Sequence, residues 1–541
     1  MITISKYIKK GVRACGRTCL ALHMSLLALT AVLTGCGDYL EIIPENYLAV
    51  DNFWQSKSDV EASLNSGYYY LRDAVEDCLI PWGEQRAGVI YGDSKVGANT
   101  LQTWQIKSTN SIASWAKMYR IVNEANLVLK NASKAQGSDR TYTSSEVNSH
   151  YCEAYFLRAL AYFYILRNWG EAPIVTEPYE TDETPLAIAK SSKSELTAFI
   201  KNDLQTAISL GAAKDAWDTT WETKGKATKW SIYALMADVC LWNQDFDEAV
   251  KYADMILTDN TANAPKLITT NTHDGWFSIF NPGNSKESIF EIQYNANLKD
   301  GSGYQTNNLY ALFSSGSEAC YHISQYAMQQ FDEDYQYQRV NKQVALYPEN
   351  ACRTLNGSYT GSAMGGGYVW KYLGGPTINE ERTSAYHDQN FIIYRVADVM
   401  LMKAEALVMR SGGTDVEDKA EALSLVNQIR NRSNLEPRQW GDDDALAILM
   451  DDIITERVME LLAEGKVWYD FLRISRYPSS EGFPDPKAAI VNKIMQYSLN
   501  NGKASITWIY SVLMNDDAWY LPVYENELKY NKSLIQNKYY K

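Results

Sequence analysis

The stretch ATKWSIYALMADVCLWNQDFDEAVKYADMILT, residues 227–258, decides the fold class. Its apolar residues recur at three- and four-residue spacing, which is typical of amphipathic helices. The pattern breaks at residues 243–245 and resumes at once with Phe246. Small residues such as Ala249 and Ala253 would let two helices approach closely. The stretch therefore predicts two helices joined by a tight turn.

A second hairpin of this kind is predicted in residues 391–433. Ala404 and Ala406 precede a Gly412-Gly413 break, after which the periodic apolar residues resume. Hairpins with small residues at the helix crossings resemble degenerate tetratricopeptide-type repeats. A generic antiparallel helix pair would give the same pattern, so both interpretations stay open on these residues alone.

The rest of the chain divides into helical and loop-rich parts, and strand-like alternation is scarce. The helical spacing recurs in residues 60–74, 114–132, 145–169, 193–210 and 443–475. Between residues 261 and 390 the composition shifts to Gly, Ser, Asn and Tyr, and loops of such length are usually functional. We predict a mainly α fold, in which a helical repeat scaffold at 36–260 and 391–541 carries a loop-rich lobe at 261–390.

The first 35 residues have the features of an export signal. Basic residues without any acid precede an apolar run over residues 20–33, which is the order found in signal peptides. The run is shorter than the roughly 20 residues of a spanning helix, and it ends in the lipobox-like Leu33-Thr34-Gly35-Cys36. We predict a lipoprotein signal peptide at 1–35 and a lipid anchor on Cys36. An ordinary signal peptide followed by a chance cysteine is the alternative.

Charge argues against nucleic-acid binding, and cysteine content argues against a disulfide framework. The leader holds five of the 51 basic residues and none of the 65 acidic ones, so its removal changes the formal net charge from −14 to −19. Such an acidic protein is a poor partner for nucleic acid. Five widely spaced cysteines remain after Cys36, and this spacing does not indicate a disulfide framework.

Several sequence blocks follow one another along the chain in an order that indicates a family. They are DYLE at 38–41, NFW at 52–54, YRIVNEAN at 119–126, EAYFLRA at 153–159, WGEAP at 169–173, YRVADV at 394–399, VNQIR at 426–430 and LPV at 521–523. Together these blocks resemble the SusD/RagB family of lipoproteins over essentially the whole chain after the leader. One departure is Lys466, which stands where the family usually has an arginine.

The resemblance implies both a fold and a role. It implies four tetratricopeptide-like helix pairs beneath a loop-rich lobe. It also implies a lipoprotein on the cell surface, at the outer membrane, that captures glycan and hands it to a SusC-like, TonB-dependent β-barrel transporter. We expect no cofactor and no metal. Two alternatives stay open: a RagB-like member that captures peptides, and a scaffold lipoprotein that binds only proteins.

Three carboxylates could suggest a hydrolase. Glu456, Glu460 and Glu464 recur at four-residue spacing, so a helix would place them on one face, and a glycosidase uses two carboxylates about 5 to 10 Å apart. Arg457 and Arg473 lie nearby in sequence, however, and pairing between carboxylate and guanidinium groups is the simpler account. The sequence has no Walker loop, nucleophile elbow, zinc-type histidine spacing or Cys-x-x-Cys. We predict that the chain is not an enzyme.

Sugar binding requires aromatic rings against the C–H faces of pyranoses, polar groups at their edges and a concave pocket. Two segments combine these residue types. The first candidates are Trp82, Arg86, Tyr91, Asp93, Asn99 and Trp104, and the second are Trp276, Tyr294, Tyr304, Tyr310 and Tyr321. The family resemblance implies that part of the binding site lies in the first segment. For any single ring, packing in the core is the alternative.

Overall fold

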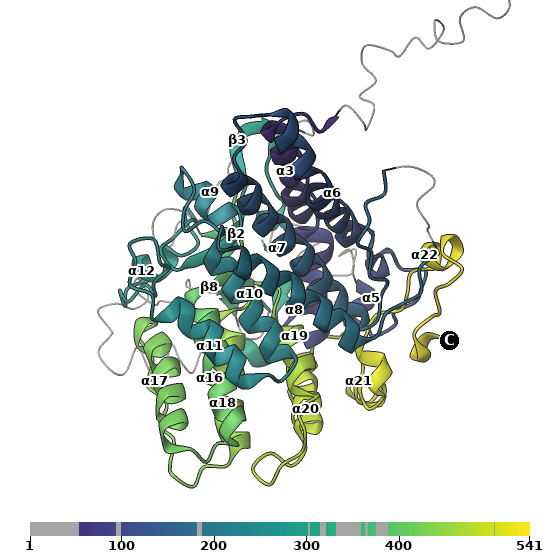
Figure 1. Ribbon diagram of the computed structural model, residues 1–541. Coiled ribbons are helices and arrows are strands. Elements are labelled where there is room, and N and C mark those ends of the chain that lie inside the picture. Colours follow the sequence, from purple (N-terminus) through teal and green to yellow (C-terminus); the bar gives the residue numbers. More distant parts are fainter. Residues whose placement is uncertain are drawn as a thin grey trace, which may run out of the picture. The chain divides into compact units, whose positions relative to one another are not determined.

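In the residues that the structure describes, four helix pairs form the main body of the protein (Figure 1). The pairs are α3 (Lys57–Asp73) with α6 (Ala116–Ser138), α7 (Ser144–Trp169) with α8 (Lys193–Leu210), α10 (Lys229–Trp242) with α11 (Phe246–Leu257), and α16 (Val396–Ser411) with α17 (Val416–Arg432). Successive pairs pack on one another, through α6 and α7, α8 and α10, and α11 and α16. The predicted mainly α fold of paired helices is therefore confirmed.

The structure is a computed structural model, which describes residues 53–92, 99–180, 187–300, 303–313, 321–331, 359–362, 366–374, 388–502 and 504–541. The predicted leader and Cys36 lie outside the described residues. In the described part, no helix has both the length and the hydropathy needed to cross a membrane.

Local sequence signals explain where several helices begin and end. Thr143 and Ser192 cap α7 and α8, and each forms a capping box with the glutamate three residues later. Gly412 ends α16 with a φ of 63°, a left-handed conformation that glycine adopts without strain. Between α10 and α11, Gln244 has a φ of 65° and forms the tight turn that the sequence predicts.

Two expected helical segments differ from the structure. Residues 391–395 form a strand, β8 (Phe391–Arg395), which pairs antiparallel with β2 (Ser288–Ile292). All five residues of β8 are buried, and a short apolar run buried on both faces cannot be distinguished from a helix by periodicity. Residues 443–475 form two helices, α18 (Leu446–Glu460) and α19 (Val467–Ile474), separated by a turn in which Ala463 and Gly465 have positive φ.

Most of the other strands and α-helices in the described residues lie in the predicted lobe or near the C-terminus. The strands are β1 (Ile90–Gly92), β3 (Asn295–Asp300), β4 (Gly303–Gln305), β5 (Tyr321–Ile323), β6 (Tyr359–Ser362) and β7 (Gly366–Val369). The helices are α4 (Ile80–Glu84), α5 (Asn99–Gln102), α9 (Thr220–Gly225), α12 (His273–Phe277), α13 (Leu309–Phe313), α15 (Trp370–Leu373), α20 (Pro486–Ser498), α21 (Ile506–Leu513) and α22 (Glu525–Tyr530). One antiparallel sheet has the order β1-β5-β7-β6, and β3 pairs with β4.

The C-terminal segment returns to the first two helix pairs. Backbone Leu521 donates to the Asn168 carbonyl at 2.7 Å, and the Trp169 indole donates to the Pro522 carbonyl at 2.9 Å. Backbone Glu525 likewise donates to the Ser108 carbonyl at 2.9 Å. Figure 1 accordingly shows α22, in yellow, near the blue elements of the first half of the chain.

Two buried carboxyl groups connect elements of the scaffold and carry raised pKa values. Tyr68 of α3 donates to Glu153 of α7 at 2.8 Å, and burial raises the pKa of Glu153 to about 7. The Glu84 carboxylate accepts from the backbone of Gly465 and Lys466 at 2.7 and 3.1 Å, and burial raises the pKa of Glu84 to about 8. Both groups therefore hold a proton in the folded protein at a pH where an exposed glutamate has lost it.

These raised pKa values predict that stability falls with rising pH. Each group contributes its full stabilisation below the unfolded pKa of about 4.5, and this contribution is lost as pH rises through the folded value. We expect the free energy of unfolding to fall between about pH 5 and pH 8. The fall should be smaller in Glu153→Gln, whose amide oxygen can still accept from Tyr68. Urea unfolding at several pH values measures this, and equal slopes for wild type and Glu153→Gln would contradict it.

Candidate ligand-binding site

The structure brings the two predicted ligand-binding segments together. Strand β1 of the first segment pairs with β5 of the second, and the register places Tyr91 opposite His322 and Gly92 opposite Tyr321. The Gln85 amide also donates to the Tyr321 hydroxyl at 3.1 Å. The segments were predicted separately from their composition, and antiparallel strand pairing makes them neighbours.

The side chain of Gln102, the last residue of α5, binds the last residue of β1. The Gln102 side chain accepts from the Gly92 amide at 2.6 Å and donates to the Gly92 carbonyl at 2.9 Å. Candidate Asp93 lies outside the described residues, and Asn99 begins α5 with its side chain also undescribed. Trp104 follows α5 but is only 5% exposed, and its ring packs edge-on against that of Trp468, with 5.5 Å between the ring centroids.

Trp82 and Arg86 have structural contacts in place of the expected contact with ligand, because both are fully buried. The Trp82 indole donates to the Ile112 carbonyl at 2.8 Å. The Arg86 guanidinium donates to the Trp519 carbonyl at 2.9 Å and to the Asn168 side chain at 3.0 Å. These bonds join α4 and the following turn to distant parts of the chain, so neither side chain reaches solvent.

Three candidates of the second segment are also buried, and this corrects the expectation that they face a ligand. Trp276 is fully buried with its ring 5.0 Å from that of Phe280, and Tyr321 is 2% exposed. Tyr294 is 9% exposed and donates to the Arg72 carbonyl at 3.3 Å. The packing alternative therefore holds for these rings. The side chain of Tyr304 is not among those that the structure describes.

Among the candidates whose side chains the structure describes, Tyr91 and Tyr310 are the half-buried ones. The Tyr91 ring lies 5.4 Å from the ring of His322, with 33° between the ring planes. Tyr91 and His322 are the half-buried residues of two strands whose other residues are buried. Side chains alternate between the two faces of a strand, so the neighbour of a buried Tyr321 is expected on the more exposed face. This alternation indicates His322, whereas composition alone does not. We call these two rings the Tyr91–His322 face.

The three carboxylates of the predicted helical run are held in buried ion pairs. Glu456 pairs with Arg430 at 2.9 Å, Glu460 pairs with Arg395 at 2.7 Å, and Glu464 pairs with Arg395 at 2.9 Å. Burial raises the pKa of Glu464, but Arg395 and Lys371 outweigh burial and lower it overall. A catalytic acid needs a raised pKa, and the lowered pKa of Glu464 does not suit that role.

The three glutamates pair with arginines, as predicted, but the predicted partners Arg457 and Arg473 were wrong. Arg457 pairs with Asp398 and Asp470 at 3.0 and 2.8 Å, and Arg473 pairs with Glu405 at 2.7 Å. Side chains three and four residues apart compete with tertiary partners, and here the tertiary partners bind the three glutamates. Among the described residues, no group of three or more His, Cys, Asp or Glu is arranged to hold a metal ion.

Comparison with family models agrees with this architecture. A model of the SusD family matches residues 335–540. A second model, described as "Starch-binding associating with outer membrane", matches residues 38–241. The two matches cover different parts of the chain, and together they include both the first helix pairs and the C-terminal helices.

Individual relatives match over most of the chain. The SusD-like protein P38 of Formosa agariphila is 27% identical over 491 residues, which cover 83% of this chain and 90% of the relative. A SusD-like protein of Bacteroides ovatus is 26% identical over 487 residues, which cover 84% of this chain and 82% of the relative.

Solved structures share the fold. A SusD superfamily protein of Bacteroides thetaiotaomicron superposes with a TM-score of 0.67 at 19% identity, over 90% of this chain and 99% of that one. A structure described as a laminarin binding SusD-like protein gives a TM-score of 0.62 at 18% identity, over 90% and 99% of the two chains. The paired helices, the two family models and the curated relatives agree with the sequence resemblance, and the chain belongs to the SusD/RagB family.

Proposed function

We propose that this protein is a cell-surface lipoprotein that captures oligosaccharide and delivers it to a SusC-like, TonB-dependent transporter of the outer membrane. One observation carries the proposal. In a chain of this family, the pairing of β1 with β5 brings the two aromatic segments together. The laminarin binding described for one structural neighbour makes β-glucan oligosaccharides the first ligands to test.

The chemistry of the Tyr91–His322 face suits a sugar. A pyranose presents C–H groups on its faces and hydroxyls at its edges, so a ring such as Tyr91 can stack on it while polar groups bind the hydroxyls. His322 provides such a polar group at 5.4 Å from the Tyr91 ring. We propose Tyr310 of α13, together with Asp93, Asn99 and Tyr304, as further contacts with the ligand.

The proposed anchor and partner explain how captured sugar would be used. Lipid on Cys36 would keep the protein at the outer membrane, because several acyl chains hold a protein firmly on a bilayer. A β-barrel partner in the same membrane would then receive the ligand directly. The family description "associating with outer membrane" supports this location.

Replacing Tyr91 by Ala should weaken glycan binding. We expect about a tenfold loss of affinity for laminarin oligosaccharides, since one aromatic stacking contact contributes up to about 1.5 kcal/mol. Calorimetry on the chain from residue 37 onward measures this. Tyr510→Ala is the matched control, because Tyr510 is 48% exposed on α21 and should bind no sugar.

The same titrations test the alternatives. Binding to peptides but to no glycan would replace the sugar proposal by a peptide-capturing protein. Glycan binding that Tyr91→Ala leaves unchanged would keep the function but remove the Tyr91–His322 face as its site.

A further inference from the structure

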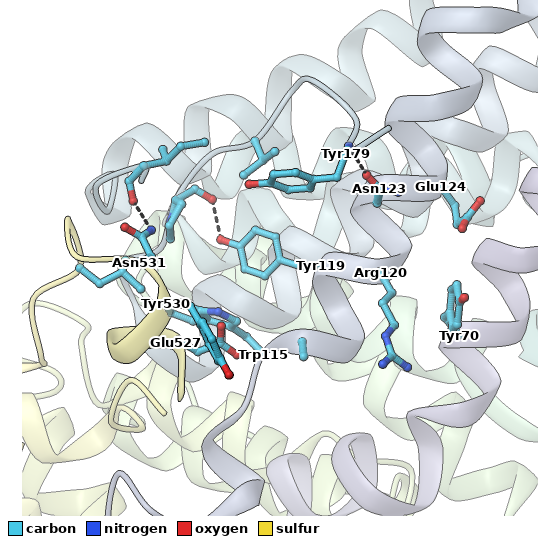
Figure 2. Close-up of a pocket in the computed structure, with 15 residues that line it drawn as sticks. Tyr70, Trp115, Tyr119, Arg120, Asn123, Glu124, Tyr179, Glu527, Tyr530 and Asn531 are labelled. Atoms are coloured by element: carbon cyan, nitrogen blue, oxygen red, sulfur yellow. Dashed lines mark hydrogen bonds between the residues drawn. The ribbon is translucent and has the colours of Figure 1, made fainter. Parts of the chain in front are cut away.

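A second site is formed by a pocket of about 450 Å³ where α3 and α6 meet α22 and the chain that follows α7 (Figure 2). We call it the α6–α22 pocket. Five aromatic residues line it, namely Tyr70, Trp115, Tyr119, Tyr179 and Tyr530. None of the residues of the Tyr91–His322 face lines it.

The rings of the α6–α22 pocket differ in how far they reach solvent. Trp115 is 4% exposed, and its ring lies 5.7 Å from that of the half-buried Tyr119. Tyr179 and Tyr530 are 38% and 72% exposed. Figure 2 shows Tyr179 and Tyr530 on either side of Tyr119. A flat ligand can therefore contact several rings at once, and the exposed rings can be removed without opening the core.

Several backbone groups at the wall of the pocket already have partners. The Tyr119 hydroxyl donates to the Pro173 carbonyl at 2.6 Å, and the Asn531 amide donates to the Ile188 carbonyl at 2.7 Å. The backbone amide of Tyr179 donates to the Asn123 side chain at 2.7 Å. A peptide that binds by strand addition needs free backbone groups on its receptor. Since these groups are occupied, the pocket favours a ligand that side chains recognise.

Side chains of α6 provide the hydrogen-bond donors that such a ligand needs. Arg120 is exposed and lies over the Tyr70 ring at 5.7 Å, and no described acid lies within 4 Å of its guanidinium. Asn123 uses its oxygen for Tyr179, while its amide nitrogen donates to no described residue. Residues three apart share one face of a helix, so both donors line the same side of the pocket.

Two carboxyl groups supply acceptors. Glu124 accepts from Ser63 at 2.8 Å, and burial raises the pKa of Glu124. Glu527 accepts from Ser114 at 3.3 Å, and burial raises its pKa as well. Rings, donors and acceptors therefore meet in one hollow, which is the combination that binds a neutral polyhydroxylated ligand.

From these features we propose that the α6–α22 pocket binds a short saccharide, so that the protein holds glycan at two separate places. Tyr179 and Tyr530 stack on the sugar rings, and Arg120 and Asn123 donate to its oxygens. This site is additional to the capture proposed at the Tyr91–His322 face. A glycan chain that contacts both places remains bound for longer than one held at a single place.

Calorimetry on the chain from residue 37 onward tests the second site, with laminarin and malto-oligosaccharides of two lengths as probes. We expect two equivalents of a short oligosaccharide to bind per wild-type chain. The Tyr179→Ala/Tyr530→Ala variant should bind one equivalent, because the affinity of the α6–α22 pocket should fall by at least about tenfold. Arg120→Ala should weaken the same site, whereas Tyr510→Ala should leave both unchanged.

The outcomes separate this proposal from the proposed function. If Tyr91→Ala removes one equivalent and the double variant removes the other, both sites are established. If the double variant and Arg120→Ala leave affinity and stoichiometry unchanged, the α6–α22 pocket is not a glycan site, and capture at the Tyr91–His322 face stands. Absence of binding to every probe by the wild type overturns the pocket proposal too. Circular dichroism checks that the exposed substitutions leave the fold intact.

Discussion

The Arg395→Ala variant should lose about 3 to 5 kcal/mol of its free energy of unfolding, because it breaks a fully buried ion network. Arg395 binds Glu287 at 2.9 Å, Glu460 at 2.7 Å and Glu464 at 2.9 Å, and all four residues are buried. Removing the guanidinium leaves carboxylates in a medium of low dielectric without their main partner. Such uncompensated charges are far more costly than the loss of an exposed pair.

The network also explains why the effect should reach beyond one helix. Arg395 ends β8 directly before α16, Glu287 directly precedes β2, and Glu460 ends α18. Arg432 at the end of α17 binds Glu287 and Glu460 as well. The loss of Arg395 therefore loosens the junction between the β2–β8 strand pair and the last helices.

Urea unfolding measures this loss, with Lys251→Ala as the control. Lys251 and Glu248 form an ion pair at 3.0 Å on the exposed side of α11, and exposed pairs contribute about 0 to 1 kcal/mol. A loss below about 1 kcal/mol in Arg395→Ala would show that Arg432 and Lys371 neutralise the three carboxylates without it.

The paired helices could be predicted from the sequence because their signals are local. The spacing in residues 193–210 coincides with α8, whose first turn is capped by Ser192. The turn between α10 and α11 could be predicted for the same reason. The strand β8 could not be predicted, because its five buried residues form an apolar run whose partner, β2, lies about a hundred residues earlier.

The candidate site could be predicted only at the level of segments. Composition identified two aromatic segments, but exposure depends on contacts that are distant in sequence. Arg86, for example, is fully buried, and its guanidinium donates to the carbonyl of Trp519, which lies 433 residues away. The α6–α22 pocket was missed for the same reason, since Tyr70, Tyr179 and Tyr530 come from separate parts of the chain.

One signal for the α6–α22 pocket was nevertheless present in the sequence. The family block at residues 119–126 contains Arg120 and Asn123, two polar residues on one helical face. In the absence of a known position for α22, that face could equally have been solvent-exposed.

The Gly83→Ala substitution should have the second large effect, a loss of about 3 kcal/mol in the free energy of unfolding through steric conflict. A Cβ atom at position 83 would lie 2.0 Å from the carbonyl oxygen of Gly465 and 2.2 Å from its carbonyl carbon. Both are backbone atoms, and the adjacent Glu84 side chain holds them by accepting from the Gly465 and Lys466 amides with one carboxyl oxygen. The turn between α18 and α19 cannot move away without breaking these bonds.

Gly137→Ala is the matched control, since Gly137 lies in α6 and a Cβ there would have no neighbour within 4 Å. In a helix, Ala is favoured over Gly by about 0.5 to 1 kcal/mol, so this variant should be slightly more stable than the wild type. The two substitutions add the same methyl group, and urea unfolding should show their free energies of unfolding shifted in opposite directions. A Gly83→Ala protein as stable as the wild type would mean that α4 does not pack against this turn in solution, and that Glu84 is not held in its buried position.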